Sequence, residues 1–328
     1  MITRLGNNAY GKKAINLSRI LRFPDRHEIR QITVNISLQG DFGTAHTIGD
    51  NTKILPTDTM KNTVYALAKD QFNTSIEAFG MVLVDHFLIH NPQVTAAAAE
   101  LTEYCWSRIL IDGAPHPHSF VNGGSEKHTA LIRKDRKSLS ITAGIKDLLI
   151  LKTTDSGFEH FIQDQYTTLK ETSDRIFSTE CEVSWKYRQS SQNQTALSAQ
   201  PASTGQQSSS DRKPPSDPKP SSNQQPSTSQ PTYPDFTSLY GHIRNNLLQT
   251  FSSHKSLSVQ HTLYAMGETV LKEFAEVEEI TLKMPNKHHI PFNLEPFGMD
   301  NPNEIFIATD EPYGYITGTL IRDQPDAG

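Results

Sequence analysis

The chain has 328 residues, of which 35% are hydrophobic, and a formal net charge of −5. This length is enough for two domains with cores of their own, and the mildly acidic charge, with no basic stripe, argues against a nucleic-acid-binding protein. The two cysteines, Cys105 and Cys181, match no metal-ligand spacing and are too few for a disulfide framework.

Targeting signals are not evident in the sequence. No apolar segment follows the early basic residues, and no stretch approaches the roughly 20 apolar residues of a membrane-spanning helix. The last three residues are not the Ser-Lys-Leu peroxisomal signal. We therefore expect a cytoplasmic protein that binds neither membranes nor nucleic acids.

The first half of the chain contains one strongly alternating strand and two helical segments. Every second residue from Ile32 to Leu38 is apolar and the residues between them are polar, which is the pattern of a strand with one buried face. Residues 60–69 and 75–90 have the composition and spacing of helices. The half therefore combines strands with a pair of helices.

The second half repeats this outline. Strands are predicted to begin at Leu139 and to run through 280–284 and 305–307, and Ser258 is a suitable N-cap for a helix. We predict an antiparallel α+β fold in two related domains, with the boundary near residues 135–140. Two buried helical stripes are formed by Leu239, Ile243, Leu247 and Phe251 and by Val259, Leu263, Met266, Val270 and Phe274.

A polar segment at 189–232 interrupts the second half. It consists mostly of serine, glutamine and proline, and Leu197 is its single large aliphatic residue. Such a composition cannot bury enough apolar surface to offset the entropy lost on ordering. We expect a disordered surface insertion.

Six polar strings stand out from ordinary surface sequence, while the GxGxxG, Walker, HExxH and nucleophile-elbow motifs are absent. In this order the strings resemble the urate oxidase family, and the resemblance covers the chain except for 189–232 and the stretch after about Pro302. The strings are YGKK (10–13), PTDTMKNTVY (56–65), IDGAPHPHSF (111–120), QYTTLKETSDR (165–175), SVQHTLYAM (258–266) and MPNKHH (284–289).

The resemblance implies a tandem tunnelling fold (T-fold). Each domain, 1–137 and 138–328, is then an antiparallel four-stranded sheet with two helices on one face, and four chains form a barrel with active sites at subunit interfaces. The implied reaction converts urate, molecular oxygen and water to 5-hydroxyisourate and hydrogen peroxide, with no metal or other cofactor. The implied partners are urate, oxygen and three further copies of the chain.

Four residues match the family's substrate-binding positions. Phe158 matches the aromatic residue that stacks on the purine, and Arg175 matches the residue that grips the pyrimidine edge. Val259 contributes backbone, and Gln260 pairs with the opposite edge. The chemistry is suited to urate, because a guanidinium and a carboxamide satisfy the two edges of a flat anion and a ring covers its face.

Five residues match the positions around oxygen and the proton path. Asn286 and His288 match the pair at the oxygen and water site, and Lys12, Thr57 and Asp58 match groups that the neighbouring subunit supplies. We expect Lys12, Thr57 and His288 to move protons, and Arg175 to position the substrate.

Each of these residues also has a simpler interpretation. Arg175, close to Asp174 on a predicted helix, could be a surface ion-pair residue, and Phe158 could belong to the core. Gln260 could be a solvated helix residue, and Thr57 with Asp58 could cap a helix.

His116 and His118 have a spacing that could place both on one face of a strand as metal ligands. No carboxylate or cysteine that could complete such a site is evident in the sequence, so structural roles are favoured. Two other functions also remain open. One is a zinc-dependent T-fold enzyme that acts on a pterin or related purine. The other is a purine-binding protein without catalytic activity.

Overall fold

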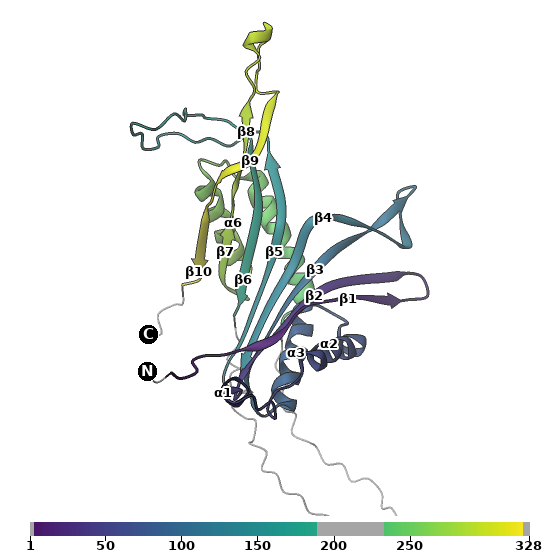
Figure 1. Cartoon of the computed structure of the whole chain (residues 1–328). Coiled ribbons are helices and arrows are strands. Elements are labelled where there is room, and N and C mark those ends of the chain that lie inside the picture. The colour runs from purple at the N-terminus through teal and green to yellow at the C-terminus, as the bar shows by residue number, and fades with distance from the viewer. Residues whose placement is uncertain (1–2, 189–232, 324–328) are drawn as a thin grey trace, which may run out of the picture.

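The strands of both halves form one ten-stranded antiparallel sheet in the computed structural model, which describes residues 3–188 and 233–323. The hydrogen-bonded order is β1-β2-β3-β4-β5-β6-β7-β10, and β8 pairs with both β6 and β9 (Figure 1). The strands are β1 (Tyr10–Arg22), β2 (His27–Gly40), β3 (Val94–Ile111), β4 (Ala114–Asp135), β5 (Leu139–Lys152), β6 (Phe177–Tyr187), β7 (Val277–Lys283), β8 (Asn286–Pro291), β9 (Phe306–Gly314) and β10 (Thr317–Ile321).

Two pairs of helices cover the sheet, one pair in each half (Figure 1). Sequence periodicity predicted all four helices, whereas it did not predict two short elements, α1 (Gly43–Thr47) and the 3-10 helix η1 (Glu295–Phe297). The four are α2 (Thr57–Gln71), α3 (Ile76–His90), α5 (Phe236–Ser253) and α6 (Val259–Glu273). This agrees with the expected α+β class and with two helices for each half.

The alternating pattern of β2 arises because one face of the strand packs under the helices. Ile32, Val34 and Leu38 are completely buried. Helix α3 approaches the sheet closely at Gly80, where an added Cβ atom would lie 2.5 Å from Cδ1 of Ile132. Burial of such aliphatic side chains stabilises the fold by roughly 1.5–3 kcal/mol each. The predicted buried strand is confirmed.

Helix α6 begins where the sequence predicted. The Ser258 hydroxyl accepts a hydrogen bond from the amide of His261 at 3.1 Å, so Ser258 is the N-cap. Val259, Leu263, Met266 and Val270 are buried along the predicted stripe, and Phe274 forms the C-cap. The cap therefore fixes Val259 and Gln260 as the first two residues of the helix.

The predicted domain boundary falls in a tight turn between β4 and β5. Asp135 Oδ1 accepts hydrogen bonds from the amides of Lys137 and Ser138, each at 2.7 Å. Residues 127–134 then pair directly with residues 139–146, so the sheet continues from one half into the other. The division into domains 1–137 and 138–328 stays a prediction, and the proposed insertion at 189–232 lies outside the described residues.

A buried charge cluster lies under the helices where the two halves meet. His128 of β4 contacts Oε1 of Glu77 from α3 at 2.9 Å, and its other ring nitrogen lies 3.7 Å from Glu103 of β3. Glu103 also accepts two hydrogen bonds from Arg30, at 2.6 and 2.7 Å. The His128 ring stacks on Tyr240 of α5 with 3.8 Å between ring centres. The cluster thus connects helices from both halves.

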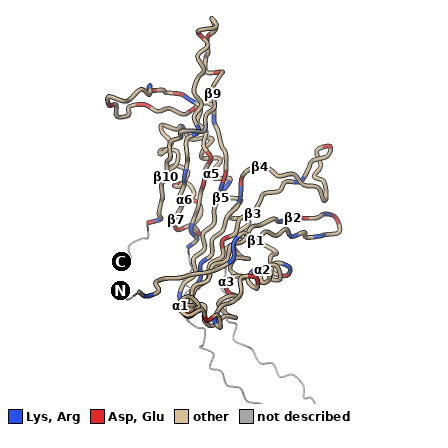
Figure 2. Tube along the Cα trace, in the orientation of Figure 1, with Lys and Arg blue, Asp and Glu red and all other residues tan. Residues whose placement is uncertain are grey.

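Charges of both signs occur along the strands, and Figure 2 shows no long stripe of one sign on the trace. Among the helices of the described ranges, none combines the length and apolar character needed to cross a membrane.

Candidate active site

Phe158 and Arg175 lie together in the long segment between β5 and β6. The guanidinium carbon of Arg175 is 5.3 Å from the centre of the Phe158 ring. The Phe158 amide donates a hydrogen bond to the Thr172 carbonyl at 2.7 Å, and the Thr172 amide donates back at 3.1 Å. These two bonds align the two arms of the segment, the first arm running from β5 to Phe158 and the second from Thr172 through Arg175 to β6. The structure thereby brings together the residues predicted to cover the face and grip the edge of a flat anion.

Arg175 has no carboxylate within ion-pair distance among the described residues. Asp174 accepts a hydrogen bond from the Thr154 hydroxyl, and Glu171 accepts one from the His160 amide. The segment 165–175 contains no helix, so the simpler interpretation of Arg175 as a helical ion-pair residue is wrong. Burial lowers the pKa of Arg175. A partly buried guanidinium without a carboxylate partner is suited to binding an anion.

Helix α6 begins next to this segment. The Gly157 amide donates to the Ser256 carbonyl at 2.8 Å, and the Ser256 amide donates to the Asp155 carbonyl at 2.9 Å. The first amides of a helix have no acceptor within the helix, and they carry the positive end of its dipole. Val259 and Gln260 occupy this position, with Gln260 exposed. Val259 and Gln260 therefore follow closely after Ser256, the residue that bonds the stretch just before Phe158.

Asn286 and His288 lie in β8, which pairs with the beginning of β6. Asn286 is the register partner of Thr179, four residues after Arg175 in the sequence. The side-chain amide nitrogen of Asn286 lies 3.3 Å from Nδ1 of His288. Both side chains lie on the same side of the strand because they are two residues apart. The structure thus brings together the two residues predicted to surround oxygen and water.

Lys12, Thr57 and Asp58 form a second group in the first half. Thr57 is the first residue of α2 and follows Pro56, which is the N-cap and makes no side-chain cap. The prediction that Thr57 caps the helix is therefore wrong, although Asp58 does place a carboxylate in the first turn. Hydrogen bonding to Lys61 is the main cause that lowers the pKa of Asp58, and the charge of Lys12 contributes in the same direction.

Gly11 allows the backbone of β1, next to Lys12, to pack closely against the backbone of β2. A Cβ atom at this position would lie 1.8 Å from the carbonyl oxygen of Ile36, which is backbone and cannot rotate away. We expect Gly11→Ala to lower the free energy of unfolding by about 1–3 kcal/mol. Urea unfolding of the purified full-length protein measures this change. Gly6→Ala is the matched control, because no atom lies within 4 Å of its added Cβ. Equal stability of the two variants would contradict the expected clash.

The two groups of predicted residues are separated within one chain. No hydrogen bond or ion pair between described residues joins Lys12, Thr57 or Asp58 to the group around Arg175. Figure 1 shows α2 at the lower right, whereas the segment after β5 projects at the upper left. Within one chain, the two groups therefore lie on elements that are not in direct hydrogen-bond or ion-pair contact in the described ranges.

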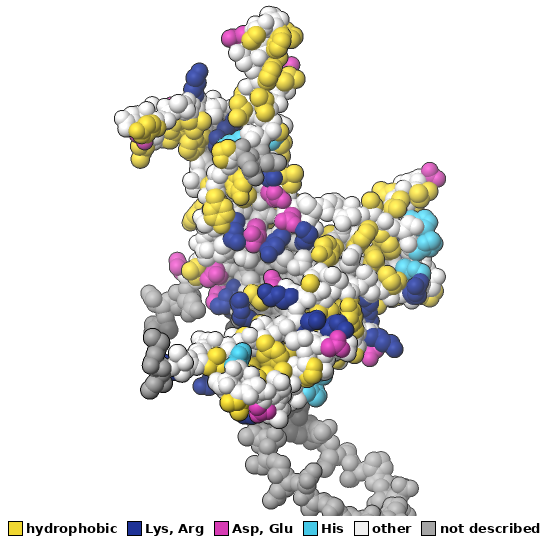
Figure 3. Space-filling model, viewed as in Figure 1, with side chains coloured by type: hydrophobic (Ala, Val, Ile, Leu, Met, Phe, Trp, Pro, Cys, Tyr) yellow, Lys and Arg dark blue, Asp and Glu magenta, His cyan; other side chains and the backbone are white. Residues whose placement is uncertain are grey.

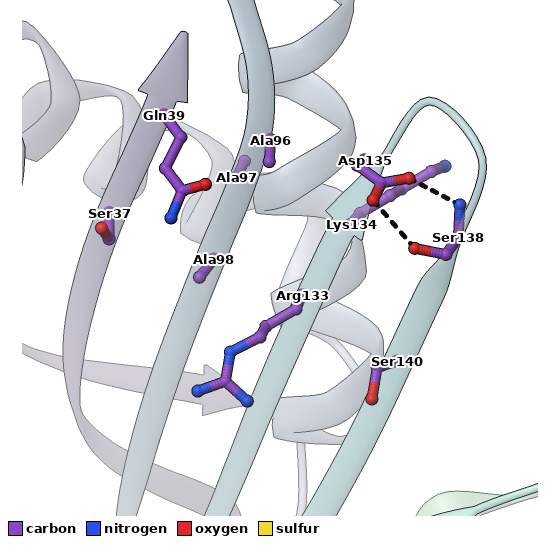
Figure 4. A pocket seen from close by; sticks show the side chains of 10 residues that line it. All are labelled: Ser37, Gln39, Ala96, Ala97, Ala98, Arg133, Lys134, Asp135, Ser138 and Ser140. Atoms are coloured by element: carbon purple, nitrogen blue, oxygen red, sulfur yellow. Dashed lines mark hydrogen bonds between the residues drawn. The ribbon is translucent and has the colours of Figure 1, made fainter. Parts of the chain in front are cut away.

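A separate hollow of about 300 Å³ lies on the strands of the first half and β5. Figure 4 shows the Arg133 side chain extending toward the strand that carries Ala98, while Asp135 bonds Ser138 in the turn. Ser37 and Gln39 line it and alternate with core residues of β2, so the hollow is on the face away from the helices. None of the nine predicted site residues lines this hollow.

The sequence did not reveal several buried polar groups close to the second-half site. The Ser156 hydroxyl and the Thr262 hydroxyl are buried and have no hydrogen-bond partner among the described residues, and the same is true of Thr179 and of Nε2 of His254. Buried groups of this kind are commonly satisfied by ordered water. Serine and threonine are too common for their type alone to have marked these positions.

The predicted histidine pair, His116 and His118, forms an edge-to-face contact with 4.5 Å between ring centres. No group of three histidine, cysteine, aspartate or glutamate residues within 3–188 and 233–323 has the geometry to hold a metal ion. The structural role favoured for the two histidines stays a prediction.

Known proteins resemble this chain over most of its length. The uricase family model matches residues 8–133 and 141–317, so the similarity extends beyond the limit expected near Pro302. A uricase of Arthrobacter globiformis is 37% identical over 319 residues, which cover 97% of this chain and 90% of that protein. Uricase-2 of Phaseolus vulgaris is 36% identical over 327 residues, with coverages of 95% and 94%.

Solved structures agree with the sequence comparison. The crystal structure of the uricase from Arthrobacter globiformis superimposes with a TM-score of 0.82 at 36% identity, and the match covers 100% of this chain and 98% of that chain. Urate oxidase of Bacillus sp. TB-90 has a TM-score of 0.73 at 20% identity, with coverages of 96% and 100%, and so shares the fold. The predicted fold class is confirmed.

Proposed function

The chain belongs to the uricase family and is a urate oxidase, and we propose that it converts urate, oxygen and water to 5-hydroxyisourate and hydrogen peroxide without a cofactor. Urate loses two electrons to dioxygen, which becomes hydrogen peroxide, and water supplies the oxygen atom of the new hydroxyl group. The observation that carries the proposal is the guanidinium of Arg175, which has no carboxylate partner among the described residues and lies 5.3 Å from the Phe158 ring.

The residues proposed to bind the substrate all lie in the second half of the chain, and their chemistry suits urate. Arg175 donates two parallel hydrogen bonds to one edge of the urate anion, and Phe158 stacks on its face, which contributes about 0.5–1.5 kcal/mol beyond area burial. Gln260 offers a donor and an acceptor to the opposite edge, and the free amide of Val259 adds a donor. These contacts fix the orientation of the ring but transfer no proton.

Proton transfer belongs to Lys12, Thr57 and His288 in this proposal. Urate must lose a further proton before it can donate electrons readily, and the peroxide that forms must gain protons. A lysine, a hydroxyl and an imidazole in hydrogen-bond sequence can carry protons in both directions. Asn286, 3.3 Å from His288, is suited to holding oxygen or water above the ring.

The active site is shared between subunits of a homotetramer in this proposal. Support comes from the separation of Lys12, Thr57 and Asp58 from the Arg175 group within one chain. Large apolar side chains are also exposed on projecting arms, among them Leu110 (63%) in the β3–β4 arm and Phe297 (64%) in the β8–β9 arm (Figure 3). Exposed apolar patches of this kind commonly mark contacts between proteins.

The test uses purified full-length protein after treatment with a chelator. We expect it to remove the ultraviolet absorbance of urate in air, to release hydrogen peroxide in equal amount, and to do neither without oxygen. Failure to consume urate in air would reject the proposed function.

The same assay distinguishes the two alternatives. Activity that is lost on metal removal and restored by zinc would indicate a zinc-dependent T-fold enzyme. Binding of urate without any peroxide would indicate a purine-binding protein that has kept the fold.

A further inference from the structure

We propose that Asp174 is a positioning residue that keeps Arg175 available to the substrate anion. The inference rests on the proposed function, because it concerns the residue next to the predicted substrate-binding arginine. Asp174 and Arg175 are adjacent in the chain and carry opposite charges, so an ion pair between them would compete with anion binding by the guanidinium. In this structure the Asp174 carboxylate is directed to other partners.

Both carboxylate oxygens of Asp174 are used by the opposite arm of the segment. Oδ2 accepts a hydrogen bond from the Thr154 hydroxyl at 2.9 Å, and Oδ1 lies 3.4 Å from the Ser156 amide in a weaker contact. The carbonyl oxygen of Asp174 accepts a third bond, from the Thr172 hydroxyl at 2.7 Å. These contacts tie Asp174 to the residues that precede and face Phe158.

The contacts have two consequences for the neighbouring guanidinium. The carboxylate is held on Thr154 and Ser156, so it does not neutralise Arg175 by an ion pair. The two arms are also held at a fixed separation, together with the Phe158–Thr172 backbone pair. That separation sets how the Arg175 guanidinium lies against the Phe158 ring. Asp174 thus acts on substrate binding through Arg175 and has no need to touch the substrate.

Backbone geometry around Gly157 shows how little freedom this arrangement has. A Cβ atom on Gly157 would lie 3.0 Å from the Ser173 carbonyl oxygen and 3.1 Å from that of Thr172. The arm that carries Phe158 therefore packs backbone to backbone against the arm that carries Arg175. A small displacement of one arm would therefore change the distance between the Arg175 guanidinium and the Phe158 ring.

The experiment compares Asp174→Ala, Asp174→Asn and Thr154→Val in the full-length protein. We expect Asp174→Ala to raise the KM for urate about tenfold while kcat changes less than about threefold, because the loss concerns binding. Thr154→Val keeps the charge and removes one hydrogen bond, so we expect KM to rise about three- to fivefold. Asp174→Asn keeps an acceptor for the Ser156 amide, so its KM should lie much closer to the wild-type value than the KM of Asp174→Ala.

Binding without turnover provides a second readout. The Kd for urate under anaerobic conditions, measured by calorimetry, should rise in parallel with KM. Asp164→Ala is the matched control, since Asp164 lies in the same segment and bonds Tyr166 and Thr167 in its own turn. We expect it to leave KM and Kd unchanged.

The outcomes separate this inference from the proposed function. A wild-type protein that does not oxidise urate overturns the function. A wild-type protein that oxidises urate, with Asp174→Ala and Thr154→Val at wild-type KM and Kd, overturns the role of Asp174. Equal losses in Asp164→Ala and Asp174→Ala would show general disturbance of the segment and would also overturn it.

Discussion

Replacing Lys12 with alanine is expected to lower kcat for urate by about 100- to 10,000-fold, with a much smaller change in KM. The reason is that Lys12 moves protons in the proposed mechanism and does not hold the ring. Arg175→Ala should affect both constants, because it removes charge-assisted hydrogen bonds worth about 1.5–3 kcal/mol each. Steady-state kinetics with urate in air-saturated buffer distinguishes the two patterns.

Lys13→Ala is the matched control for the first variant. Lys13 is the next residue of β1 and is exposed, and no catalytic position is assigned to it. It should retain kcat and KM close to those of the wild type. Lys12→Ala and Arg175→Ala with equal effects on KM and none on kcat would reject the division between proton transfer and positioning.

Mixing the two inactive variants tests whether the site is shared. When Lys12→Ala and Arg175→Ala chains are co-expressed, some sites receive an intact Lys12 from one chain and an intact Arg175 from the other. Random assembly gives about one quarter of the sites both intact residues, so we expect about a quarter of wild-type activity. A site built within one chain would show no recovery. The expected quarter of wild-type activity is the same for a dimer and for any larger assembly, as long as each site takes its two residues from different chains.

Replacing His128 with alanine is expected to lower the free energy of unfolding by about 3–5 kcal/mol, since it leaves a buried carboxylate without its partner. Glu77 is completely buried, and its second oxygen has no hydrogen bond among the described residues. Double replacement of Glu77 and His128 by leucine removes both charges and should cost much less than the single variant. Guanidinium unfolding at a fixed protein concentration measures these changes.

The pH dependence of stability provides a separate test of the same cluster. Burial alone would lower the pKa of His128, but interaction with Glu103 and Glu77 outweighs it, and the pKa of His128 is raised above its ordinary value of 6.5. Because the folded protein binds this proton more tightly, the contribution is complete below pH 6.5 and is lost as the pH rises through the raised pKa.

Glu103 acts in the opposite direction at low pH. Burial would raise its pKa, but hydrogen bonding to His128 and Arg30 lowers it below the ordinary value of 4.5 for a glutamate. Its contribution is present above pH 4.5 and is lost as the pH falls through the lowered pKa.

The expected stability profile therefore has a maximum between about pH 4.5 and pH 6.5 from this cluster, and its alkaline side should disappear in His128→Ala.

An exposed ion pair provides the control for these variants of the buried cluster. Lys272 and Glu268 lie on the surface of α6 with side chains 68% and 40% exposed, so Lys272→Ala should change stability by less than about 1 kcal/mol. An unchanged profile in His128→Ala would contradict the role of the cluster.

Local sequence patterns identified the four long helices and the strands β2, β5, β7 and β9. Strand β2 was predictable because sheet residues alternate between a buried and an open face, and α6 because Ser258 and the spacing of Val259 and Met266 identify the cap and the buried stripe. Local patterns failed between residues 165 and 175. The helical interpretation was wrong because Thr172 bonds to Phe158 and Asp174 bonds to Thr154, partners that no local rule can identify.

By itself, the sequence determined the types of the four long helices and of four strands, the family through six ordered strings, and the candidate residues at the site. The tertiary structure decided which of those residues meet: Phe158 with Arg175, and Asn286 with His288, whereas no hydrogen bond or ion pair in the described ranges joins Lys12 to these four. It also decided that Asp174 bonds Thr154 while its neighbour Arg175 has no carboxylate partner in the described part of the chain. The physical reason is that element type depends on neighbours along the chain, whereas a binding site depends on hydrogen bonds and packing between segments far apart in sequence.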